Sequence, residues 1–172
     1  LRYSTEWEAS GSGVDNTIGL LTLTSWALTS RGGQTIAHEV GHCLQYQTHC
    51  DNNDMNGWMY GYGDNASGGN GWWEQCAQWQ AYKVFPTQQF NNEWFTSYLN
   101  NVHKHILHET PRYQNFFIQD FWTYKRGKDV IGQLWRKSIK PEDPVEAYKR
   151  LFSLTQTAFN DEMWECAARF TT

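Results

Sequence analysis

Residues 34–47 read QTIAHEVGHCLQYQ, and this stretch decides how the rest of the chain is interpreted. Its apolar residues recur every fourth position and predict an α-helix with one apolar face: Ile36, Val40 and Leu44. His38 and His42 are also four residues apart, so their side chains lie one above the other on a neighbouring face. We therefore expect a helix that carries a pair of imidazoles on one side.

The histidine pair has the spacing of a zinc-binding motif, because two imidazoles one helical turn apart can reach one ion at about 2.0–2.1 Å. Glu39 is rotated roughly 100° from the pair. We expect it beside the metal, as the general base that takes a proton from the metal-bound water. Gly41 costs about 1 kcal/mol relative to alanine inside a helix, so it predicts close approach of another helix or of substrate. The alternative is a helix whose histidines are merely surface or core residues.

A catalytic zinc ion commonly has three protein ligands and one open position, so a third ligand is needed. Glu74 lies early in a predicted helix after a loop; the alternative is an exposed glutamate favoured by the helix dipole. His49 is the rival, but the longer motif that uses a third histidine requires glycine at 45 and histidine at 48. The chain has Gln45 and Thr48 there. The predicted zinc ligands are His38, His42 and Glu74.

The length and composition predict one folded domain over residues 1–172, rich in aromatic residues. The net charge of -4, with lysine and arginine scattered along the chain, argues against nucleic acid as a partner. No apolar run has the length of a membrane span, which predicts a soluble domain. The start at Leu1, without methionine or a signal peptide, is what a processed or excised piece of a longer protein would show.

The chain has four cysteines, which would form two disulfides in an exported protein or stay reduced in the cytosol: Cys43, Cys50, Cys76 and Cys166. If one helix carries both Cys43 and Cys50, their α-carbons are about 10 Å apart, too far for a bridge. A bridge between Cys43 and Cys76 is the more plausible pairing.

The order of the predicted elements is a strand-bearing N-terminal part followed by helices. Gly11 to Asp15 reads as a loop and Thr17 to Leu28 as a strand. A long loop rich in glycine and asparagine follows the histidine helix, over residues 51–71. The later helices are expected at 72–84, near 88–107, and at 111–124, 128–138, 143–154 and 157–169, with Asp143 and Asn160 as N-caps. The predicted fold class is α+β, a small sheet on the histidine helix followed by a mainly helical lobe.

Residues 38–45, HEVGHCLQ, with Trp73-Glu74 downstream, resemble the gluzincin group of zinc metallopeptidases, including its enhancin-like and mucin-degrading branch. The wider run, from Gly19-Leu20 to the segment PEDPVEAY at 141–148, is similar to an uncharacterised zincin-like domain family of secreted microbial proteins. The resemblance implies a zincin-like fold and a secreted or cell-surface location.

For the individual residues, the resemblance implies zinc ligation by the two histidines and Glu74, with Glu39 as the base and later the proton donor to the leaving amine. It also implies an edge strand, here Ile18 to Leu28, that pairs with extended substrate. Gln78 stands where well-known gluzincins have an acidic residue that orients the first histidine. Tyr113 and His108, from the later helical part, are the candidates for stabilising the oxyanion. His108 also belongs to a cluster with His103, His105 and Glu109 that is otherwise expected to be solvated or structural.

The function predicted from these residues is a zinc endopeptidase that acts on proteins or glycoproteins, with the aromatic loop 57–72 as one wall of its cleft. The main alternative is an inactive zincin-like module that presents aromatic residues to a protein or glycan: Trp58, Tyr60, Tyr62, Trp72 and Trp73. Intact Glu39 argues against it, because a purely structural site needs no base. A third alternative is a metal-dependent hydrolase of a non-peptide bond, which would share the same ligands.

Overall fold

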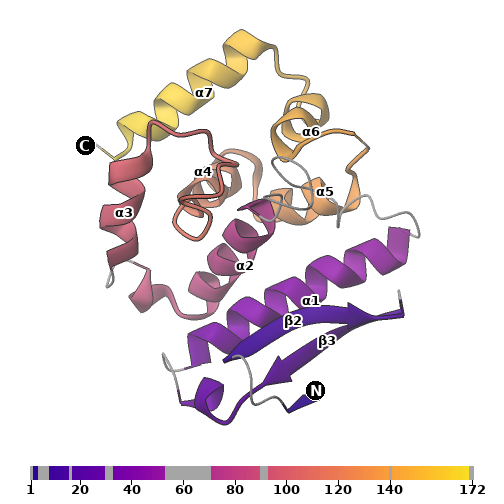
Figure 1. The fold of residues 1–172 in the computed structure, drawn as a ribbon. Helices are drawn as coiled ribbons and strands as arrows, with labels where there is room; N and C mark the ends of the chain where they lie inside the picture. Colours follow the sequence, from indigo (N-terminus) through magenta and orange to yellow (C-terminus); the bar gives the residue numbers. More distant parts are fainter. Residues whose placement is uncertain are drawn as a thin grey trace.

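The computed structural model describes residues 2–3, 8–15, 17–29, 33–52, 71–89, 93–139 and 141–170. Within them a small sheet lies on one side of a long helix, α1, and the later helices lie on its other side (Figure 1). This arrangement confirms the α+β prediction. The predicted aromatic loop falls almost entirely on residues 53–70, so Trp58, Tyr60 and Tyr62 lie outside the described residues.

The sheet has three strands in the order β1-β3-β2, namely β1 (Arg2–Tyr3), β2 (Ala9–Val14) and β3 (Ile18–Leu23). β2 and β3 form an antiparallel hairpin whose last pair is Val14 and Ile18, and β1 runs parallel to β3. The predicted strand from Thr17 to Leu28 is too long, because β3 ends at Leu23 and a 3-10 helix, η1 (Trp26–Leu28), follows.

Two expectations about this sheet are wrong. The stretch from Gly11 to Asp15 is mostly strand β2 and not a loop, and β3 is the central strand and not an edge strand. Glycine and serine have low strand propensity, so β2 is formed by its surroundings. A side chain at Gly11 or Gly13 would collide with α1, and one at Gly19 would come within 2.8 Å of the Cys43 side chain. The three glycines therefore let the sheet lie directly on the helix.

Helix α1 (Gln34–Asn52) is held between this sheet and α2 (Gly71–Val84). A side chain at Gly41 would lie 3.0 Å from the α-carbon of Ala77, so the predicted close approach of another helix is confirmed. The predicted apolar face of α1 is not its buried face, because Val40 is 37% and Leu44 is 54% exposed. The helix instead buries its glycine and its polar histidine face.

The helical lobe comprises α3 (Glu93–Asn101), α4 (Phe117–Arg126), α5 (Val130–Arg136), α6 (Pro144–Leu151) and α7 (Gln156–Ala168), with a 3-10 helix, η4 (Pro86–Gln88), after α2. Its core is aromatic, and the rings of Trp122 and Tyr148 stack with centroids 4.1 Å apart. Trp72 is fully buried in the same core, so it cannot belong to an aromatic binding surface.

The helix boundaries differ from the prediction between residues 102 and 116, where the chain makes turns instead of continuing two helices. Side chains replace helical backbone hydrogen bonds there, since the side-chain amides of Gln75 and Asn115 both donate to the backbone carbonyl of Ile106. Pro111 in this segment has no N–H to offer a helix. At the other helix starts, Asp143 caps α6 as predicted, whereas Asn160 lies inside α7 and Thr155 is its N-cap.

All four cysteines are free thiols, so the expected bridge between Cys43 and Cys76 is not formed. The two residues face different layers, since Cys43 packs against Gly19 of the sheet and Cys76 is buried in the core of the helical lobe. Burial raises the pKa of both thiols, which favours their unreactive protonated form. None of the described helices combines the length and apolar character needed to cross a bilayer.

Candidate metal centre

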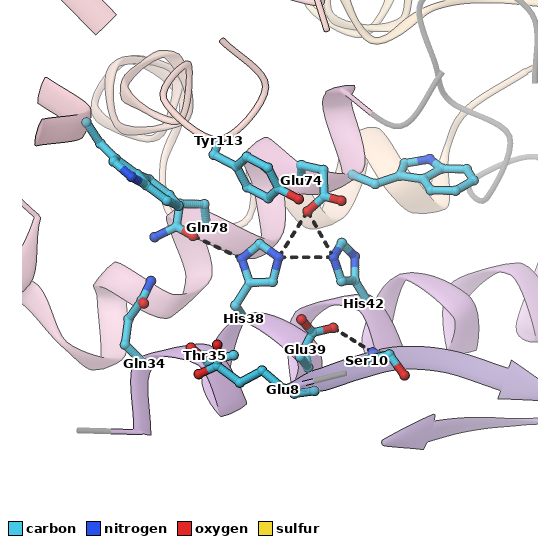
Figure 2. A pocket seen from close by; sticks show the side chains of 14 residues that line it. Glu8, Ser10, Gln34, Thr35, His38, Glu39, His42, Glu74, Gln78 and Tyr113 are labelled. Carbon is cyan, nitrogen blue, oxygen red and sulfur yellow. Dashed lines mark hydrogen bonds and ion pairs between the residues drawn. The ribbon is translucent and has the colours of Figure 1, made fainter. Parts of the chain in front are cut away.

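Three potential metal ligands meet where α1 packs on α2. His38 and His42 come from adjacent turns of α1, Glu74 comes from the first turn of α2, and all three ligand atoms lie within 4.8 Å of one another. Glu74 Oε2 is 3.0 Å from His38 Nε2 and 3.3 Å from His42 Nε2. The two Nε2 atoms are 3.1 Å apart (Figure 2). The structure thus brings together the three residues predicted as ligands.

The outer nitrogen of each imidazole is held by a glutamine. His38 Nδ1 is 3.0 Å from Gln78 Oε1, and His42 Nδ1 is 2.9 Å from Gln45 Oε1. The amide nitrogen of Gln45 donates to the carbonyl of Trp73, so its oxygen is the atom that faces His42. An amide oxygen accepts from N–H, which places the imidazole proton on Nδ1 and leaves the Nε2 lone pair directed at Glu74.

The role of Gln78 as a partner of the first histidine was expected, whereas that of Gln45 was not. Gln45 follows His42 by three residues, a spacing at which helical side chains are neighbours, so the sequence did carry the signal. Gln45 also spans from α1 to the backbone of α2. It therefore fixes both the orientation of His42 and the distance between the two helices.

Glu74 and the two histidines shift one another's pKa values. Burial alone would raise the pKa of Glu74, but hydrogen bonds from the two imidazoles, which exist only while protons occupy their Nε2 positions, hold it well below its ordinary range. Burial alone would lower the pKa of His42, but the hydrogen bond and charge of Glu74 outweigh it and raise that pKa. Two nitrogen lone pairs and one carboxylate converging within hydrogen-bond distance need a cation between them, either a proton or a metal ion.

Glu39 lies beside this centre and is held by the sheet. The backbone N–H of Gly11 in β2 donates to Glu39 Oε2 over 2.6 Å, and Glu39 lines the same pocket as the three ligand residues. The contact exists because Gly11 has no side chain to separate β2 from α1. The edge strand of the sheet therefore sets where the Glu39 carboxylate lies.

We expect Gly11→Ala to destabilise the protein by about 1–3 kcal/mol, the usual cost of overpacking. The added methyl would collide with the backbone carbonyl of Glu39 and lie 2.7 Å from His42 Cβ, so β2 must move away from α1. Gly13→Ala is the matched control, because its methyl would meet the ring of Tyr46, a side chain that can rotate. Urea unfolding of both variants measures the difference. A Gly11→Ala protein as stable as wild type would show that the close packing is unnecessary.

The centre opens into a pocket of about 540 Å³, whose lining comes from β2 and the residue before it, α1, α2, α3 and the turns before α4. Tyr113 lines it, with its ring centroid 5.9 Å from that of His38, and Figure 2 shows its hydroxyl directed towards Glu74. Burial and the charge of Glu74 raise the pKa of Tyr113 and keep its hydroxyl protonated. His108, the other oxyanion candidate, does not line the pocket, and its Nδ1 accepts from the N–H of Thr110.

The remaining candidates are divided between the pocket and the rest of the chain. Trp73 of α2 and Trp94 of α3 both line the pocket, unlike the buried Trp72. Among the described residues, Trp73 is therefore the one member of the aromatic surface predicted for a binding module that lines the pocket. The side chain of His49, the rival third ligand, lies outside the described residues.

Fold and site together define an α+β protein with a buried cluster of two histidines and one glutamate beside an open pocket. The chain belongs to a family of unknown function, DUF6055, whose family model matches residues 1–172. No curated protein and no solved structure matches the chain.

Proposed function

We propose that the chain is a zinc-dependent endopeptidase of zincin-like fold, which hydrolyses peptide bonds of proteins or glycoproteins. The observation that carries the proposal is the convergence of His38 Nε2, His42 Nε2 and Glu74 Oε2 within 4.8 Å beside the separate carboxylate of Glu39. A purely structural site would need neither the open pocket nor a carboxylate outside the ligand set.

The donor set fits zinc. Two neutral imidazole nitrogens and one carboxylate oxygen form a ligand set that catalytic zinc sites use, with the fourth position left to water or substrate. Gln78 and Gln45 hold the Nδ1 protons, so both Nε2 atoms are in the form that binds a metal. When bound there, zinc would supply a Lewis acid that polarises a carbonyl and makes a water molecule more acidic.

The chain's own groups have distinct tasks in this proposal. Glu39 accepts the proton of the attacking water and returns it to the leaving amine, and the Gly11 N–H keeps its carboxylate oriented. Tyr113, protonated and directed into the pocket, donates a hydrogen bond to the negative charge that develops on the carbonyl oxygen. Figure 2 shows Glu39 and Tyr113 on opposite sides of His38.

The substrate strand is expected along β2 and not along Ile18 to Leu28. The Gly11 N–H faces away from β3, because it donates to Glu39. Alternate residues of an antiparallel strand share that direction, so Ala9 and Gly13 present main-chain groups at the same edge. Ala9 and Gly11 both line the pocket. An extended peptide can therefore pair with the edge that passes the metal centre.

Zinc content and peptide hydrolysis, measured on the same protein, test the proposal. We expect about one zinc per chain after reconstitution, cleavage of unfolded protein substrates at internal bonds, loss of cleavage after chelation, and recovery when zinc is returned. Elemental analysis and mass spectrometry of the fragments provide the two readouts. A protein that binds no zinc after reconstitution contradicts the proposal. One that binds zinc but cleaves no peptide contradicts its peptidase part.

A further inference from the structure

The pocket beside the metal centre is acidic. Its described lining holds three carboxylates, Glu8, Glu39 and Glu74, and no lysine or arginine. Glu74 contacts the two histidines, and Glu39 accepts a hydrogen bond from the N–H of Gly11. Glu8, immediately before β2, is the remaining carboxylate. The pocket should therefore repel acidic ligands and attract a positive charge.

Glu8 carries a buried oxygen that the rest of the described chain does not satisfy. Its Oε1 is shielded from solvent and has no hydrogen-bond partner among the described residues. A buried charged oxygen without a donor is costly, so a donor from outside the chain is the simplest way to balance it.

Two more buried polar atoms in the same pocket have no partner among the described residues, the hydroxyl of Thr35 and the Nε2 of Gln78. Figure 2 shows Glu8 and Thr35 on the side of His38 and Glu39 that is opposite Glu74. Glu8 and Thr35 thus extend the pocket away from Glu74, near the start of β2, where substrate would pass, whereas Gln78 lies on α2 beside His38. Native interiors contain few such atoms, and their gathering in one pocket is what a binding subsite would show.

We propose that Glu8 forms a specificity subsite that binds a positively charged nitrogen of the substrate. The proposal rests on the function proposed above and adds the substrate class to it. The charged nitrogen has two sources, the side chain of a lysine or arginine near the cleaved bond, or the free α-amino group of a peptide. Either would donate to Glu8 Oε1, with the hydroxyl oxygen of Thr35 as a second acceptor. Gln78 Nε2 is itself a donor and would bind a carbonyl oxygen of the substrate instead.

Binding of short peptides tests the subsite without requiring turnover. Isothermal titration calorimetry compares three sets of hexapeptides on zinc-loaded Glu39→Gln protein and on metal-free wild type. One set is capped at both ends and carries a lysine at each position in turn, the second has norleucine in its place, and the third is neutral with a free N-terminus. We expect the lysine set or the free-amine set to bind about 10- to 100-fold more tightly than the norleucine set, as for one hydrogen bond to a charged group.

The variants decide whether Glu8 is responsible. Glu8→Gln should remove the preference for the charged peptides, and Glu165→Gln, the same change on the surface of α7, should keep it. If Glu8→Gln does not fold by circular dichroism, Glu8→Asp replaces it and should weaken the preference. No preference in wild type, or a preference that survives in the Glu8 variant, overturns the proposal. A protein that prefers cationic peptides but binds no zinc would contradict the peptidase and not the subsite.

Discussion

Zinc-loaded Glu39→Gln protein should hydrolyse peptides about 10²- to 10⁴-fold more slowly than wild type, the range that a positioned general base contributes. Glutamine keeps the size of the side chain, and its carbonyl oxygen can still accept the N–H of Gly11. It cannot take a proton from water at neutral pH. The variant therefore removes the proton transfer while leaving the shape of the pocket in place.

Zinc content separates this effect from loss of the metal. Glu39 lies outside the group of three ligand atoms, so Glu39→Gln should hold as much zinc as wild type by elemental analysis. Steady-state rates on one internally cleaved peptide then report the chemical step, with Glu165→Gln as a control of equal charge change on the surface. A Glu39→Gln protein that retains zinc and more than about a tenth of the wild-type rate would assign the base to another residue.

The parts of the site that the sequence predicted are those set by local geometry. His38 and His42 are one turn apart on one helix, and that spacing puts both imidazoles on one face, where their Nε2 atoms lie 3.1 Å apart. The cap of α6 is equally local, since Asp143 and Glu146 bond each other's backbone within one turn. The position of Glu74 could not be predicted from local geometry alone, because it depends on how α2 crosses α1. The glycine at 41 was the sign of that crossing.

The parts that the sequence did not predict are set by contacts between distant segments. β2 reads as a loop because Ser10, Gly11 and Ser12 lack strand propensity, yet packing on α1 makes it a strand. Glycines at 11 and 13 share one face of a strand, and this period of two was the available signal. Nothing local marks Glu8, whose importance comes only from the pocket it lines. The exposed Val40 and Leu44 show the reverse case, an apolar pattern that does not mark the buried face.

Glu74→Ala should lower zinc affinity at pH 8 by more than about 100-fold, because loss of a mere outer-sphere partner already costs up to that amount. Glu74 supplies the carboxylate and the only formal negative charge of the three-ligand set. Glu74→Gln keeps the side-chain size and loses the charge, so it should fall between wild type and the alanine variant. Gln78→Ala, which removes only the partner of His38 Nδ1, should cost about 10- to 100-fold. Competition with a chromophoric chelator measures all four affinities.

The difference in zinc affinity between wild type and Glu74→Ala should be smaller at pH 6 than at pH 8. This pH dependence would show that a proton competes with zinc at His42. Glu74 raises the pKa of His42, so in wild type a proton competes with zinc for His42 Nε2 as the pH falls through that raised pKa. Without Glu74, burial is opposed only by the hydrogen bond of Gln45 and the charge of Glu39, so the pKa of His42 is lower than in wild type and less of its imidazole is protonated at pH 6. Acid thus weakens zinc binding more in wild type than in the variant. A Glu74→Ala protein whose zinc affinity at pH 8 stays within about 10-fold of the wild-type affinity would instead exclude Glu74 as a ligand. His49→Ala would then be the next variant to measure.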